Sequence, residues 1–183
     1  GDWLAVREVE PVEYLQELDM AAGVLKRSVR FTDNRQREIS LVERRLVSMD
    51  TPHLAGLETE ITVHNWSGSI YVHTALDGRV DNTLVKRYRP LNNNHLEQVT
   101  VGASEDSRLL WLQAETSQSH IRVAAACLTR IFENGEEAEV QRRTLQEQGY
   151  VGQEMAVRVE EGRPLRIEKT AAFYTSRDRA ITE

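Results

Sequence analysis

The sequence predicts an all-β fold, a large antiparallel β-sandwich, and three observations support this prediction. Apolar and polar residues alternate along many short segments, which is typical of strands with one face on a core and the other in water. Turn-forming residues separate these segments at short intervals, as in sandwiches and barrels. The 4 prolines lie near segment ends, where a strand tolerates them. We therefore expect roughly a dozen strands.

The alternating segments follow one another along the whole chain. In each segment the residues expected on one face of the strand are mostly apolar. They are, in order, Leu25, Arg27, Val29 and Phe31, then Ile61 and Val63, then Ile70, Val72 and Leu76, and finally Met155, Val157 and Val159. The stretch 136–148 has helix-forming residues, yet Val140 and Leu145 are its only large apolar side chains. These are too few for an amphipathic stripe, so we expect an exposed strand there. The stretch 12–20 presents the same ambiguity.

Polar and glycine-containing breaks mark the predicted turns. Asn65-Trp66-Ser67-Gly68 and Glu161-Gly162-Arg163-Pro164 each separate two alternating segments and predict hairpin turns. Asp33-Asn34-Arg35 and Asp106-Ser107 are further polar breaks. The longest segment without a strand pattern is 78–95, and loops of that length in a compact domain are usually functional or disordered.

Length and charge exclude several classes of protein. A chain of 183 residues fits one soluble domain, and 29 acidic against 23 basic residues give a net charge of −6. This balance argues against nucleic acid or an anionic membrane as a partner. The longest apolar run, 123–128, is far shorter than the ~20 residues of a membrane-spanning helix. We expect no signal peptide and a cytoplasmic location.

Few residues have the spacing of a known catalytic or metal site. Cys127 is the only cysteine; its apolar setting predicts a buried thiol, and the lack of a partner excludes an internal disulfide. The histidines form no H-x-H or H-x-x-x-H pair, and neither a G-x-S-x-G turn nor a phosphate-binding glycine loop is present. We therefore expect no metal, no cofactor and no complete catalytic site in this chain.

A sugar-binding site would need an exposed aromatic ring beside polar groups. Trp66, in the first of the two glycine-containing turns, is the best candidate for a sugar platform. Trp111 lies in Leu-Leu-Trp-Leu, and we expect it in the core. The basic residues Lys86, Arg87 and Arg89 could bind phosphate or a carboxylate, although a solvated or interface cluster is the simpler interpretation.

Several segments, taken together and in order, carry a resemblance to a known family. They are Leu18-Asp19-Met20 with Gly23-Val24-Leu25, Arg44-Arg45-Leu46-Val47-Ser48-Met49 with Pro52-His53-Leu54-Ala55, Asn65-Trp66-Ser67-Gly68, Leu76-Asp77-Gly78-Arg79-Val80, Arg87-Tyr88-Arg89-Pro90-Leu91-Asn92 with His95-Leu96, and Glu168-Lys169 with Tyr174-Thr175-Ser176-Arg177-Asp178. The chain resembles the N-terminal domain of glycoside hydrolase family 65, which includes maltose, trehalose, kojibiose and nigerose phosphorylases.

The resemblance implies a fold and an architecture. It implies a twisted super-sandwich of the galactose-mutarotase-like type, with residues 1–183 as a single domain that lacks the family's first strands. It also implies that this domain is cut from a longer enzyme whose catalytic (α/α)₆ barrel lies outside the chain. The parent would act with inversion on α-linked glucose disaccharides, using inorganic phosphate or, in hydrolytic members, water. The chain alone is then not expected to be an active enzyme.

The expected role of this domain is to support the barrel and a homodimer. The segment 78–95 concentrates hydrogen-bonding side chains suited to an interface or a position near the substrate, namely Arg87, Arg89, Asn92, Asn93 and His95. Three alternatives stay open: a free-standing carbohydrate-binding module using Trp66, a purely structural module, and a mutarotase-like epimerase. The last would need His73 or His120 as an acid beside a glutamate base.

Overall fold

The structure is a computed structural model that describes residues 10–81 and 94–178. Within these ranges the chain forms twelve strands and no helix, which confirms the all-β prediction, and no segment there could cross a membrane as a helix. The strands are β1 (Pro11–Asp19), β2 (Val24–Thr32), β3 (Glu38–Val47), β4 (Leu54–Val63), β5 (Gly68–Asp77), β6 (Leu96–Ala103), β7 (Leu109–Thr116), β8 (Arg122–Glu133), β9 (Glu136–Glu137), β10 (Arg142–Glu147), β11 (Tyr150–Val159) and β12 (Pro164–Thr175).

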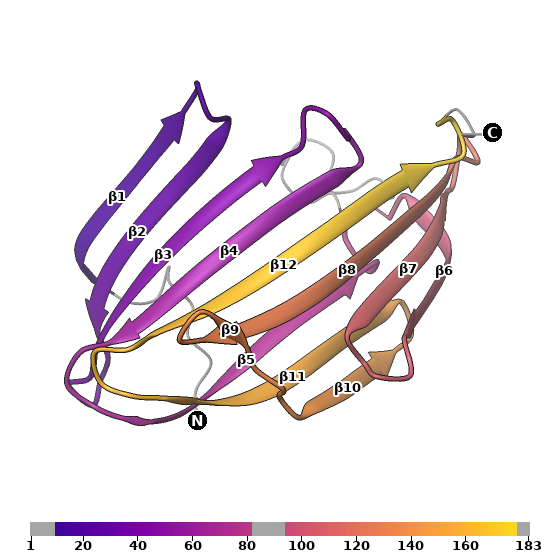
Figure 1. Cartoon of the computed structure of the whole chain (residues 1–183). Helices are drawn as coiled ribbons and strands as arrows, with labels where there is room; N and C mark the ends of the chain where they lie inside the picture. The colour runs from indigo at the N-terminus through magenta and orange to yellow at the C-terminus, as the bar shows by residue number, and fades with distance from the viewer. Residues whose placement is uncertain (1–9, 82–93, 179–183) are drawn as a thin grey trace. The chain divides into compact units, whose positions relative to one another are not determined.

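The strands form two sheets, as expected for a β-sandwich. The larger sheet has the order β1-β2-β3-β4-β12-β8-β7-β6, with β9 paired to β8, and the smaller has the order β10-β11-β5 (Figure 1). Strands β2, β3 and β4 pair antiparallel in regular register: Phe31 lies opposite Ile39, which in turn lies opposite Val63. The predicted antiparallel sandwich is therefore confirmed.

The chain divides into two compact units. The first comprises Gly1–Val72, Thr129–Gln141 and Ala156–Thr170, and the second comprises His73–Leu128, Arg142–Met155 and Ala171–Glu183. Four strands, β5, β8, β11 and β12, begin in one unit and end in the other. The expectation that residues 1–183 form a single domain stays a prediction.

The first unit buries side chains from both sheets. Phe31, Val63 and Ile131 of the larger sheet are fully buried, and Val157 and Val159 of β11 are nearly so. These residues occupy alternate positions of their strands, so the two-residue period that predicted strands also identified their buried faces.

The second unit has its own core. Leu110 and Cys127 of the larger sheet and Val151 of the smaller sheet form one buried cluster. Partly buried Leu76, Val101, Ala103 and Ala171 pack around it. Cys127 is 1% exposed, which confirms the predicted buried thiol.

The prediction that Trp111 belongs to the core is wrong. In β7 the buried residues are Leu110, Leu112 and Ala114, whereas Trp111 is 37% exposed. The run Leu-Leu-Trp-Leu places large apolar side chains on both faces of one strand, so hydrophobicity alone could not identify the buried face. In the structure, buried and exposed residues alternate along β7, and Trp111 lies on the exposed face with Gln113.

The two predicted glycine-containing hairpins are also wrong. The turn between β4 and β5, residues 65–67, and the turn between β11 and β12, residues 160–163, each connect one sheet to the other. They are bonded to one another in the first unit, because Gly162 N donates to Val63 O at 2.8 Å and Glu161 N donates to Ser67 Oγ at 2.9 Å. Hairpins and sheet-crossing corners use the same turn residues, so composition did not separate them.

The other turns and the first ambiguous stretch along the chain, 12–20, agree with expectation, and the second, 136–148, agrees in being strand rather than helix. Asp33-Asn34-Arg35 lies in the β2–β3 hairpin and Asp106-Ser107 in the β6–β7 hairpin. Residues 12–19 of the first stretch form most of β1, which is exposed along its whole length. The stretch 136–148 contains β9 and β10, so two short strands replace the one expected.

Candidate functional site

The loop predicted to contact other parts of the enzyme is described only at its two ends. Asp81 and Asn94 form an antiparallel bridge that closes the segment 82–93. Arg87, Arg89, Asn92 and Asn93 lie outside the described residues, so their predicted roles stay predictions. His95 is exposed, and its carbonyl accepts a hydrogen bond of 3.0 Å from Ser117 N.

Trp66 lies at a corner between the two sheets and is half-buried. The guanidinium carbon of Arg37 lies 4.5 Å from the ring centroid, in cation–π geometry. A Cβ placed on Gly68 would lie 3.3 Å from the ring. The indole Nε1 is buried and has no hydrogen-bond partner among the described residues. A sugar stacked on this ring would have to compete with Arg37, and the proposed platform at Trp66 stays a prediction.

Asp33 fixes the position of Arg37. Its carboxylate accepts hydrogen bonds from Arg35 N at 2.8 Å, from Arg37 N at 3.0 Å and from Arg37 Nε at 2.7 Å. Burial raises the pKa of Asp33, but the hydrogen bonds from the Arg37 side chain and the two backbone amides outweigh it, so the pKa lies below its usual value. The sequence predicts the turn but not this frame around Trp66.

Asp33→Asn is expected to lower the free energy of unfolding by about 1–2 kcal/mol at neutral pH, because it removes charge-assisted hydrogen bonds. The folded-state pKa is depressed, so the stabilisation is present above the unfolded-state pKa of about 4. It is lost as the pH falls through the folded-state value. Denaturant unfolding of the wild type and of Asp33→Asn from pH 7 to pH 2 measures the gap between their free energies of unfolding. This gap should close in acid. Asp50→Asn, at an exposed turn carboxylate, is the matched control. A gap that does not change with pH would contradict the assignment.

A second polar cluster lies on the outer face of the smaller sheet, in the second unit. His73 Nε2 lies 2.5 Å from Tyr150 Oη, and His73 Nδ1 lies 3.6 Å from Glu154 Oε1. The partners are separated by 77 positions in the first pair, so no sequence motif marks them. A Cβ on Gly152 would lie 3.0 Å from Tyr150 Oη, so the glycine leaves the space that the His73–Tyr150 pair needs.

Burial raises the pKa of the Tyr150 phenol and keeps it protonated. Burial is the main cause that raises its pKa, and Asp77 adds to it, while Arg79 opposes it from 4.5 Å over the ring. Arg79 is itself held by Asp77 at 2.9 Å and by Glu147 at 2.8 Å. The phenol hydroxyl and His73 Nε2 share a hydrogen bond whose donor is set by the histidine tautomer, and Nδ1 faces Glu154. Both ring nitrogens of His73 therefore face protein groups rather than a substrate.

The other histidine considered as an acid is also beside a glutamate. His120 Nδ1 lies 2.8 Å from Glu115 Oε1, and the His120 side chain is 70% exposed. The structure therefore brings each of His73 and His120 next to a glutamate, as the epimerase alternative requires. A substrate pocket at either pair would be needed to support that alternative further.

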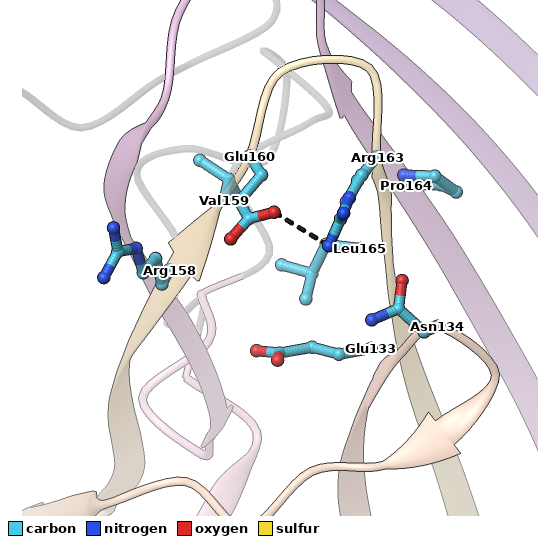
Figure 2. Close-up of a pocket in the computed structure, with 8 residues that line it drawn as sticks. All are labelled: Glu133, Asn134, Arg158, Val159, Glu160, Arg163, Pro164 and Leu165. Carbon is cyan, nitrogen blue, oxygen red and sulfur yellow. Dashed lines mark ion pairs between the residues drawn. The ribbon is translucent and has the colours of Figure 1, made fainter.

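A small polar pocket lies in the first unit, between the turn after β8 and the turn before β12 (Figure 2). Its volume is about 90 Å³, and it is lined by Glu133, Asn134, Arg158, Val159, Glu160, Arg163, Pro164 and Leu165. Arg163 Nη1 and Glu160 Oε2 form an ion pair of 2.9 Å on one side, with Glu133 and Asn134 on the other. Ligand pockets usually measure about 300–1,000 Å³, so this one does not hold a disaccharide.

The described part of the chain contains no group of three or more His, Cys, Asp or Glu side chains placed to hold a metal ion. The clusters at Trp66, His73 and Glu133 consist of hydrogen bonds, ion pairs and ring contacts.

Comparison with known proteins gives the family. The model of the glycosyl hydrolase family 65 N-terminal domain matches residues 1–183. An uncharacterized glycosyl hydrolase of Mycobacterium tuberculosis (strain ATCC 25618 / H37Rv) is 36% identical over 180 residues, which are 98% of this chain and 13% of that protein. A solved structure from the human microbiome, titled only provisionally as a kojibiose phosphorylase, superposes with a TM-score of 0.74 at 16% identity, over 94% of this chain and 20% of that one.

Named phosphorylases are more distant relatives. Kojibiose phosphorylase of Caldanaerobacter subterraneus subsp. tengcongensis is 27% identical over 183 residues, which are 97% of this chain and 23% of the enzyme. The α,α-trehalose phosphorylase of Thermoanaerobacter brockii is 25% identical over 177 residues, which are 90% of this chain and 21% of the enzyme. The chain thus spans less than a quarter of the length of these relatives. The domain model matches the whole length of this chain, and the chain belongs to the glycosyl hydrolase family 65 N-terminal domain family.

Proposed function

We propose that this chain is the non-catalytic N-terminal domain of an inverting phosphorylase or hydrolase that acts on α-linked glucose disaccharides in carbohydrate metabolism. The observation that carries the proposal is the match of the family model to the entire chain. Kojibiose and trehalose phosphorylases match 90–97% of the chain in two comparisons at 25–27% identity. The sole cysteine supports a reducing compartment, and we propose a cytoplasmic location.

In the proposed parent enzyme the reaction takes place in a second domain, an (α/α)₆ barrel. There a carboxylic acid protonates the glycosidic oxygen while inorganic phosphate attacks the anomeric carbon from the opposite face. A hydrolytic parent would use water activated by a second carboxylate. In this proposal no residue of the present chain is a catalytic residue.

The contribution of this domain is to support the barrel and a homodimer. The Asp81–Asn94 bridge brings together the two ends of the segment that contains Arg87, Arg89, Asn92 and Asn93. Arginine and asparagine side chains offer several hydrogen bonds each and are suited to a domain interface. We therefore propose this segment as the contact with the barrel.

The natural polypeptide that contains these residues should release glucose 1-phosphate from an α-linked glucose disaccharide. Kojibiose, trehalose and maltose would be incubated with and without inorganic phosphate, with β-linked cellobiose as the control. We expect glucose 1-phosphate from one α-linked sugar, and none when phosphate is omitted. Glucose formed at the same rate without phosphate would change the reaction to hydrolysis. No product from any α-linked sugar would contradict the proposed function, and light scattering of the same sample tests the homodimer.

A further inference from the structure

Trp111 has surroundings that no other described tryptophan shares. It lies on the outer face of β7, directly opposite Gly102 of β6 and Ala126 of β8. A Cβ placed on Gly102 would lie 2.5 Å from the indole, so the ring lies against the backbone of β6. A glycine within a strand often marks the close approach of another group, and here that group is the indole. Its two cross-strand neighbours are the smallest residues available.

The exposed part of the Trp111 ring is not covered by a cation. Three other aromatic rings on the described surface each lie under an arginine: Trp66 under Arg37, Tyr150 under Arg79 and Phe132 under Arg166. Among the described residues, no guanidinium or ammonium lies over Trp111, and its Nε1–H has no hydrogen-bond partner. The ring is therefore open to a ligand.

Two neutral polar side chains flank the ring on the same face. Thr100 lies directly opposite Gln113, one step along the sheet from the Gly102–Trp111 pair, and both are exposed. Neither side chain has a hydrogen-bond partner among the described residues. The register of β6 shifts next to them, between Glu97 and Thr100, where Gln98 has a φ of 51°. Bulges of this kind redirect side chains at sheet edges, and β6 is an edge strand.

We propose that the surface formed by Thr100, Gly102, Trp111 and Gln113, here named the Trp111 platform, is a binding site for a glucosyl ring of an α-linked glucose saccharide. The apolar C–H face of the pyranose would stack on the indole, whose π-face is negative and attracts polarised C–H groups. The Gln113 amide, the Thr100 hydroxyl and the indole N–H would hydrogen-bond sugar hydroxyls. The choice of an α-glucoside rests on the proposed function, whereas the site itself rests on this geometry.

The chemistry of the Trp111 platform favours a sugar over a protein partner. Its hydrogen-bonding groups are neutral, as an uncharged saccharide requires, and amides and hydroxyls can each donate and accept. A stable protein interface buries about 800 Å² per partner around a cluster of large anchors. Here the large ring has only glycine and alanine as cross-strand neighbours. One aromatic ring with flanking polar groups matches the size of one sugar unit.

Calorimetric titration of the 183-residue chain with kojibiose, trehalose and maltose tests the proposal. We expect saturable binding of at least one of these α-linked sugars and weaker binding of cellobiose. Trp111→Ala should weaken that binding at least about tenfold, the loss expected when a stacked aromatic ring is removed. Phe132→Ala, which removes an outer-face ring covered by arginines, is the matched control and should bind as the wild type does.

Two further variants keep the test valid if Trp111→Ala changes the fold. Gln113→Ala and Thr100→Ala remove only exposed side chains, and circular dichroism should show both to be folded. Each should weaken binding by about threefold or more, the value of one lost hydrogen bond. Unchanged affinity in both, or no saturable binding by the wild type, would overturn the proposal. A loss in Trp66→Ala but not in Trp111→Ala would also overturn it and place the site at the corner.

The same site must be open in the longer natural polypeptide. Trp111→Cys would be treated with a maleimide, and labelling would be measured on the peptide that carries position 111. Rapid labelling, slowed by the bound sugar, is the expected result, whereas Cys127 should stay unlabelled because it is buried. Complete protection without sugar would show that another domain or a second copy covers the ring, and would overturn the proposal. None of these measurements depends on phosphorolysis, so the Trp111 platform and the proposed function can fail separately.

Discussion

Replacing Phe31 by alanine is expected to lower the free energy of unfolding by about 3–5 kcal/mol. Phe31 is 0% exposed and belongs to the core of the first unit. It lies on β2 opposite Ile39, between two hydrogen-bonded neighbouring strands. Two contributions add up to this loss. The variant no longer gains the free energy of burying the aromatic ring, and it also contains a cavity that the surrounding strands cannot close. Denaturant unfolding at neutral pH measures this loss.

Tyr71→Ala is the matched control for Phe31→Ala. Tyr71 is also an aromatic residue on a strand, but it is 67% exposed, and we expect a change within about 0.5 kcal/mol. Equal losses in the two variants would contradict the assignment of Phe31 to the core. A domain of this size is typically stable by about 5–15 kcal/mol, so Phe31→Ala could leave little native protein at 37 °C.

Gly102→Ala is expected to destabilise the domain by about 1–3 kcal/mol through overpacking. The added Cβ would lie 2.5, 2.6 and 2.8 Å from three atoms of the Trp111 indole. The ring is large and rigid, so it would have to move off the strand rather than shift one flexible end. The near-ultraviolet circular dichroism should change together with stability, because the environment of the indole changes.

Gly56→Ala is a matched control for Gly102→Ala. Gly56 is also within a strand, β4, but the nearest atom to its added Cβ is Leu46 Cγ at 3.7 Å, an ordinary contact. Alanine there reduces the entropy of the unfolded chain without a clash, so stability should stay the same or rise by up to about 1 kcal/mol. A similar loss in both variants would show that the Trp111–Gly102 contact is not the cause.

Alternation with a period of two predicted much of this fold. It identified the faces that contain Val29, Phe31 and Val63 without any knowledge of which strands pair. It was less useful where a strand is apolar on both faces, as in β7, or exposed on both, as in β1. In those strands burial depends on what packs against each face, which local sequence does not determine.

The candidate sites depend much more on long-range contacts than the strands and their buried faces do. Trp66 stands out in the sequence because of its turn, but the cover provided by Arg37 follows from the Asp33 frame in a different hairpin. The sequence predicts Trp111 in the core, whereas the small residues opposite the ring in β6 and β8 leave it open. The roles expected of Arg87, Arg89, Asn92 and Asn93 stay predictions, because these residues lie outside the described ranges.

Sequence alone determined the fold class, the family resemblance and the buried thiol of Cys127, because each follows from local periodicity, residue order or apolar context. Tertiary structure decided that the turns 65–67 and 160–163 cross between sheets, and that His73 meets Tyr150 and Glu154. It also decided that the ring of Trp111 faces outward. These features depend on which strands become neighbours, and strand pairing is selected by the burial of whole faces rather than by any one segment.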